Sequence, residues 1–162
     1  MTTQSLSKLF YDGVLLDIDV SFWRGATSLK KEDLGVSNVP EIFSLGRKLV
    51  VPKKTLKIFQ TIYMKSYGLL ESHSLPFPIG KARYLPYKIL PEVLDKLESL
   101  KESFYQEANV FCTDYEKHRQ EILTLFPQHK EALSRKVLDV AEVRRRFNMN
   151  YHVYELQLPG EV

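Results

Sequence analysis

Basic side chains are concentrated in one segment of the chain. Residues 42–91 contain nine lysines and arginines and one acidic residue, Glu71, although the 162-residue chain has a net charge of only +3. Such a segment can bind phosphates or acidic proteins, because contacts between cations and phosphates release condensed counterions. With two arginines near the C-terminus, the residues that we expect to form this interface are Arg47, Lys48, Lys53, Lys54, Lys57, Lys81, Arg83, Arg144 and Arg145.

Three of these cations, Lys53, Lys54 and Lys57, lie where we expect a helix to begin. The positive end of a helix dipole disfavours each cation there by about 0.3 to 1 kcal/mol. Two interpretations remain open: an external anion binds there, or acidic residues of the chain itself balance the lysines. The candidates for internal balance are Glu92, Asp95, Glu98, Glu102 and Glu107.

Two other basic groups also allow two interpretations. In residues 73–90, Lys81 and Arg83 alternate with aromatic residues, which either stack nucleic-acid bases or pin a loop onto the core. Arg144 and Arg145 lie at the end of a predicted helix, where cations stabilise the helix dipole. They serve either that structural purpose or a phosphate-binding surface.

The sequence gives little support for catalysis. Asp17 and Asp19 share one face of a predicted strand, as the carboxylates of divalent-cation sites do, so a metal-dependent nuclease is a distant alternative. Alternating acids on a strand more often mark its solvent side, and we predict no metal site. The four histidines lack the spacing of metal ligands, and no catalytic or phosphate-loop motif is recognised. We therefore favour a non-catalytic protein without a cofactor.

Apolar periodicity predicts the helices that position these residues. Spacings of three and four predict a helix at about 52–72 and a longer one at about 91–126, which pack as an antiparallel hairpin. A third helical segment is predicted at about 128–147, with Asp139 capping its second part. One short helical turn is expected at 40–46.

The two ends of the chain predict strands. Residues 14–22 alternate apolar and polar side chains, and residues 148–158 are rich in tyrosine and valine. We expect these segments to pair, whereas the prolines and glycine of 73–90 exclude regular helix and predict an extended, aromatic-bearing loop. The predicted fold is α+β and mainly α: a long helical hairpin, a third helical segment and a small antiparallel β element, in one domain of residues 1–162.

The single cysteine, Cys112, favours a reducing compartment. Because neither a signal peptide nor a membrane-spanning run is recognised, we expect a cytoplasmic protein that has no membrane partner.

Several stretches resemble a bacterial and phage family of unknown function, DUF3150. They are VSFWRGATSLKKEDLGV, SLGRKLVVPKKTLKIF, YGLLESHSLPFPIGKARYLP and VRRRFNMNYHVYEL. Members of this family are often encoded beside MoxR-type AAA ATPases and von Willebrand A-type proteins, which implies an adaptor role. The resemblance implies no catalytic residues.

From the residues we expect a non-catalytic helical interaction subunit of a larger assembly. Its basic face binds an acidic partner, with a nucleic-acid backbone favoured over an acidic protein surface. The alternative is a protein-only adaptor of an AAA ATPase system.

Overall fold

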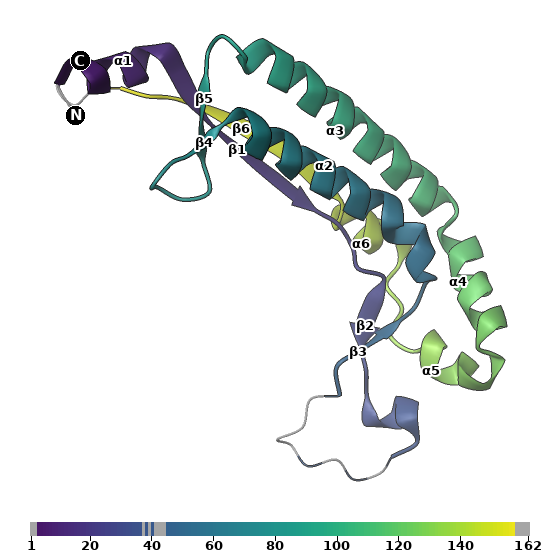
Figure 1. The fold of residues 1–162 in the computed structure, drawn as a ribbon. Helices are drawn as coiled ribbons and strands as arrows, with labels where there is room; N and C mark the ends of the chain where they lie inside the picture. Colours follow the sequence, from purple (N-terminus) through teal and green to yellow (C-terminus); the bar gives the residue numbers. More distant parts are fainter. Residues whose placement is uncertain (1–2, 37, 39, 41–44, 158–162) are drawn as a thin grey trace. The chain divides into compact units, whose positions relative to one another are not determined.

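The computed structural model describes residues 3–36, 38, 40 and 45–157 (Figure 1). The fold is α+β and mainly α, as predicted, with a helical hairpin and a small antiparallel sheet. Its elements are α1 (Thr3–Asp12), β1 (Gly13–Ser21), β2 (Ala26–Ser28), η1 (Lys31–Leu34), β3 (Arg47–Leu49), η2 (Lys53–Leu56), α2 (Lys57–His73), β4 (Leu75–Pro76), β5 (Arg83–Pro86), α3 (Leu90–Thr113), α4 (Tyr115–Leu125), η3 (Pro127–His129), α5 (Lys130–Ser134), α6 (Val140–Arg145) and β6 (Asn148–Glu155).

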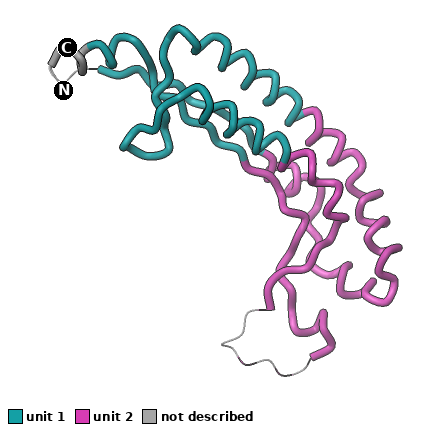
Figure 2. Tube along the Cα trace, viewed as in Figure 1, with its two compact units in different colours: residues 1–20, 61–105, 148–162 teal, residues 21–60, 106–147 magenta. Residues whose placement is uncertain are grey.

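The chain forms two compact units, shown in teal and magenta in Figure 2. Unit 1 contains residues 1–20, 61–105 and 148–162, and unit 2 contains residues 21–60 and 106–147. Each unit is assembled from segments that are distant in the sequence, so the division does not cut the chain into two consecutive domains.

Unit 1 contains a four-stranded sheet with the strand order β4-β5-β1-β6. β1 and β5 are antiparallel, with Gly13 opposite Pro86 and Leu16 opposite Arg83. β6 is bonded to the other edge of β1, which confirms the predicted pairing of the two terminal segments.

An aliphatic core joins this sheet to the hairpin. Val14, Leu16 and Ile18 alternate along β1 and are buried, as the sequence pattern predicted. They pack with Leu70 of α2 and Val93 of α3 in one cluster, and α2 and α3 run antiparallel (Figure 1).

The loop predicted as extended at 73–90 contains two strands, which were not predicted from the sequence. β4 and β5 pair with each other, and β5 also pairs with β1. Tyr84 and Leu85 are buried there, while Pro76 and Pro86 each end a strand, where proline interrupts few ladder bonds. Sheet pairing therefore overrides the composition of this segment.

Unit 2 has an aromatic core. The Phe59 ring lies 4.6 Å from Phe147 and 6.2 Å from Phe111, measured between ring centroids. Trp23 meets Phe111 and Tyr115 edge-on at 6.2 and 6.0 Å. Aromatic pairs of this geometry favour packing by roughly 0.5–1.5 kcal/mol beyond the area they bury.

The predicted helix 91–126 is not continuous. It is interrupted at Asp114, whose φ and ψ of −91° and 8° are not helical, so that α3 ends at Thr113 and α4 begins at Tyr115. Thr and Asp are weak helix formers because their side chains compete for backbone hydrogen bonds. Phe111 and Ile122, on either side of the break, are both buried as predicted.

The predicted helical segment 128–147 is also divided. Arg135 is extended, and Lys136 has a left-handed φ of 53°, which separates α5 from α6. The predicted cap is confirmed, since Asp139 accepts a hydrogen bond from the Glu142 amide at 2.8 Å.

Residues 41–44, which include most of the short helical turn expected at 40–46, lie outside the described residues.

Among the helices of the described chain, none combines the length and apolarity needed to cross a membrane.

Candidate functional site

The site begins with a tight turn that follows β1. Gly25 has a φ of +68°, and a Cβ there would lie 2.7 Å from Leu56 Cδ1 and 2.8 Å from Val51 Cγ2. Its carbonyl accepts a hydrogen bond from the Val50 amide at 2.8 Å. Only glycine tolerates both the left-handed backbone and this close approach, so Gly25 fixes the turn against η2.

Arg24 is held beside this turn by two contacts. Its guanidinium carbon lies 4.1 Å from the centroid of the Phe22 ring, and its Nη1 donates to Gln60 Oε1 at 3.1 Å. The ring contact is a cation–π interaction. Arg24 is exposed, whereas Phe22 is buried.

The start of the α2 region supplies three more cations. Pro52 precedes η2 with a φ of −59°, and its carbonyl accepts hydrogen bonds from the amide and hydroxyl of Thr55. Lys53, Lys54 and Lys57 are exposed around this turn, while Leu56 is buried.

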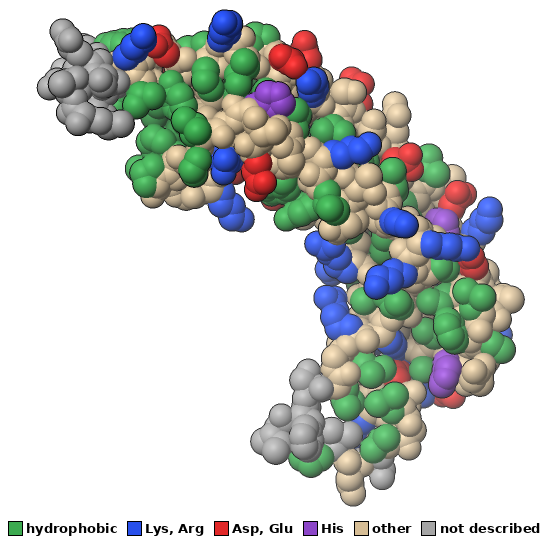
Figure 3. All heavy atoms as spheres, viewed as in Figure 1, with side chains coloured by type: hydrophobic (Ala, Val, Ile, Leu, Met, Phe, Trp, Pro, Cys, Tyr) green, Lys and Arg blue, Asp and Glu red, His purple; other side chains and the backbone are tan. Residues whose placement is uncertain are grey.

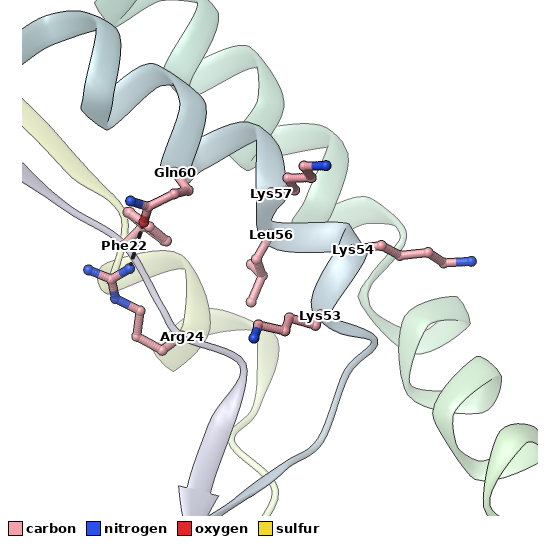
Figure 4. A pocket seen from close by; sticks show the side chains of 7 residues that line it. All are labelled: Phe22, Arg24, Lys53, Lys54, Leu56, Lys57 and Gln60. Atoms are coloured by element: carbon pink, nitrogen blue, oxygen red, sulfur yellow. Dashed lines mark hydrogen bonds between the residues drawn. The ribbon is translucent and has the colours of Figure 1, made fainter. Parts of the chain in front are cut away.

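These elements border a half-open cavity of about 540 Å³, hereafter the basic pocket. Figure 4 shows Leu56 pointing into it and Lys53 pointing toward Arg24, whereas Lys54 extends toward α4. In Figure 3, Lys and Arg side chains gather around the start of α2. The residues that line the pocket are Phe22, Arg24, Lys53, Lys54, Leu56, Lys57 and Gln60.

The electrostatics of the pocket are one-sided. No acidic side chain lines it among the described residues, and the N-terminal end of α2 adds the positive end of a helix dipole. Lys54 Nζ lies 2.6 Å from Glu121 Oε1, and this hydrogen bond holds the pKa of Glu121 below its ordinary value. Glu121 is not one of the five acids expected to balance the lysines. The pocket suits a ligand with negative charge and an apolar or aromatic part.

Arg47 and Lys48, which we predicted for the same interface, are neighbours on β3 with different surroundings. Arg47 is exposed and donates to the Ala26 carbonyl at 3.3 Å. Lys48 is buried: its Nζ lies 2.8 Å from Asp33 Oδ2 and donates to the Ala132 carbonyl at 2.5 Å. Lys48 is thus buried and is not part of the candidate interface.

Asp33 is the centre of this buried arrangement. Its other oxygen lies 3.6 Å from Arg135 Nη1, and the Asp33 side chain is 1% exposed. Desolvation raises the pKa of Asp33. Hydrogen bonds from Lys48 and the Lys30 amide lower it, as do the positive charges of Lys48 and Arg135, and together they leave the pKa below its ordinary value. Asp33 therefore remains ionised and serves as the internal partner of Lys48.

A second buried cation lies in the same unit. Arg119 is 5% exposed and donates to the carbonyls of Val50 and Leu133. These bonds satisfy buried backbone acceptors that helix and sheet leave unpaired. Lys48, its partner Asp33 and Arg119 are called the buried-cation cluster below.

The remaining predicted cations do not line the basic pocket. Lys81 and Arg83 belong to unit 1, where Lys81 is exposed and Arg83 Nε donates to Ser74 Oγ at 2.7 Å. Arg144 and Arg145 are exposed in the last turn of α6, and Arg144 donates to Asn109 Oδ1 at 2.6 Å. The structure thus brings together Lys53, Lys54 and Lys57 from the predicted set.

The two carboxylates considered for a metal site do not form one. Asp17 is half-buried and Asp19 is exposed, with the Asn148 amide 3.5 Å from Asp19. Across the described ranges, no group of three or more His, Cys, Asp or Glu side chains is placed to hold a metal ion.

Arg24 and Gln60 are the functional candidates that sequence reasoning missed. Arg24 lies in a segment with excess acidic charge, and its partner Gln60 follows much later in the chain. The available signal was Gly25 after the apolar Phe22 and Trp23, since glycine at the end of a strand pattern marks a turn.

Fold and site together define an α+β protein with a cation-lined pocket at the start of a long helix. The chain belongs to the family described as "Protein of unknown function (DUF3150)", whose model matches residues 12–162. No curated protein and no solved structure is a match.

Proposed function

We propose that this protein is a non-catalytic interaction subunit that binds a nucleic-acid backbone through the basic pocket. One observation carries the proposal: Arg24, Lys53, Lys54 and Lys57 line one cavity without an acidic lining residue in the described chain. A phosphate bound there offsets both the repulsion among these cations and their unfavourable position at the helix terminus.

The cations differ in the contacts they offer to a phosphate. Arg24 presents a planar guanidinium that can bind two phosphate oxygens at once. Lys53 is exposed and, among the described residues, joins no ion pair. Lys54 is shared with Glu121, so we expect it to contribute less than Lys53.

The test is the salt dependence of binding for wild type and for Lys53→Glu/Lys57→Glu. The affinity of the wild type should fall steeply with salt, and the slope of log K against log salt should lessen by about 0.9 for each lost duplex contact. Fluorescence anisotropy with labelled strands measures both. We expect the double variant to lose at least about 2 kcal/mol of binding free energy.

The matched control is Lys65→Glu/Lys88→Glu, which changes the net charge equally at exposed positions outside the pocket. It should retain most of the affinity if the pocket is the site. Equal losses in both variants would assign binding to overall charge, and a wild type that binds nothing at low salt would remove the proposal.

An adaptor for an AAA ATPase is the second candidate. Val110 of α3 and Leu125 of α4 are exposed at 56% and 59%, which leaves apolar side chains on these helices accessible to a protein partner. Binding to such an ATPase that persists at high salt and is lost in Val110→Glu/Leu125→Glu would support it.

A further inference from the structure

The shape of the basic pocket goes beyond what a backbone contact needs. Duplex phosphates are recognised by cations on an open surface, without a cavity. This pocket is a half-open cavity of about 540 Å³, and Phe22 and Leu56 are among its lining residues. That volume falls in the range of roughly 300–1,000 Å³ found for sites that enclose small organic groups.

One side of the pocket is arranged for a planar group. Phe22, Arg24 and Gln60 lie together there (Figure 4), with the guanidinium over the Phe22 ring. The face of Arg24 that turns away from the ring can accept a further planar group. Nucleobases stack on guanidinium planes in this way in single-stranded complexes.

Gln60 adds hydrogen-bond donors beside that plane. Its Oε1 accepts from Arg24, so the assignment of the amide is fixed by its partner. The Nε2 group keeps two donors, for which the described residues provide no acceptor within hydrogen-bond distance. A base edge carries acceptors that match these donors, whereas a phosphodiester already finds partners in the lysines.

We infer that the basic pocket receives one unpaired nucleotide of a nucleic-acid strand. The base stacks on Arg24 beside Phe22 and Leu56, Gln60 donates to its edge, and Lys53 and Lys57 contact the adjoining phosphates. Bases inside a duplex are stacked and paired and cannot enter, so the protein prefers single strands. This inference depends on the proposed function, because the same lysines hold the backbone.

The experiment compares a labelled single strand of roughly 12 nucleotides, as DNA and as RNA, with the blunt duplex of the same sequence. The single strands should bind at least about tenfold more tightly than the duplex at equal salt, although the duplex has the higher charge density. The difference between DNA and RNA tells which sugar the strand carries.

Two substitutions of exposed Gln60 locate the preference. Gln60→Trp fills the pocket and Gln60→Leu removes the donors, and both leave all four cations in place. Each should reduce the single-strand preference to less than about threefold, because single-strand affinity should fall more than duplex affinity. Thermal unfolding confirms that the variants are folded.

The outcomes separate this inference from the proposed function. Equal binding of single strand and duplex, both dependent on Lys53 and Lys57, overturns the inference and leaves the backbone proposal standing. A single-strand preference that survives both Gln60 substitutions also overturns it, because the base then binds elsewhere. Absence of all binding at low salt removes the proposed function and the inference with it.

Discussion

Lys48 and Lys53 lie close together in the most basic segment of the sequence, yet the structure gives them opposite surroundings. Lys48 faces inward from β3, where Asp33 and the Ala132 carbonyl receive its ammonium group. Lys53 lies at the rim of a cavity, and within the described ranges no carboxylate pairs with it. Charge in a sequence therefore does not measure charge on a surface.

The same contrast separates the buried-cation cluster from the basic pocket. In the cluster, protein acceptors satisfy the cations, so their role is to hold chain segments in place. In the pocket, Arg24 donates a hydrogen bond to Gln60 and has an exposed side chain. Substitutions in the cluster should therefore affect stability, and substitutions in the pocket should affect binding.

The largest effect is expected from Lys48→Met. Removing one partner of a buried ion pair leaves Asp33 with an incompletely compensated charge, at a cost of about 3–5 kcal/mol in the free energy of unfolding. Urea denaturation measures this loss, and binding by the folded fraction should not change. The double variant Lys48→Met/Asp33→Asn should recover part of the loss, and a single variant as stable as wild type would contradict the structural role.

Gly25→Ala should have an intermediate effect that links the two regions. The added Cβ meets Leu56 and Val51 and occupies a left-handed backbone, which together should cost about 2 kcal/mol of unfolding free energy. Displacement of Arg24 should also weaken nucleic-acid binding. Gly35→Ala is the control: its φ is +67°, but nothing lies within 4 Å, so only the backbone penalty of about 1 kcal/mol remains. Equal losses in the two variants would show that the contact with Leu56 is unimportant.

His118 is expected to give the smallest effect, seen only as pH falls. Desolvation lowers the pKa of His118 below 6.5, and the charges of Lys117 and Lys54 lower it further. The charges of Asp114 and Glu121 raise it, but they do not outweigh these causes. The unfolded chain then binds the proton more readily than the folded one, so stability is full above pH 6.5 and declines as pH falls below that value. Urea midpoints across this range should show the decline, and His118→Gln should remove it. An unchanged decline in that variant would assign it to another group.

The sequence predicted the elements whose packing is local and periodic. Leu16 and Ile18 alternate along β1, and Phe59 and Leu70 recur on one helix face, because a single buried side imposes its period on the residues. Asp139 was recognisable because a helix cap involves neighbouring residues only.

Features that depend on partners distant in the sequence were missed. The apolar spacing continues through Asp114, so periodicity could not reveal the break between α3 and α4. Tyr84 and Leu85 become strand residues because β1 pairs with them. Lys48 is buried because Asp33 and Ala132 approach it, and Arg24 joins the pocket because Gln60 does.

The two contacts of Arg24 have a consequence for the thermodynamics of recognition. When a long side chain becomes ordered only on ligand binding, its loss of conformational entropy weakens the binding free energy by roughly 0.5–1.5 kcal/mol. Phe22 and Gln60 already restrict the Arg24 rotamer in the free protein, so this side-chain entropy is lost on folding and not on binding. The guanidinium is preorganised, and tight binding requires correspondingly fewer new contacts.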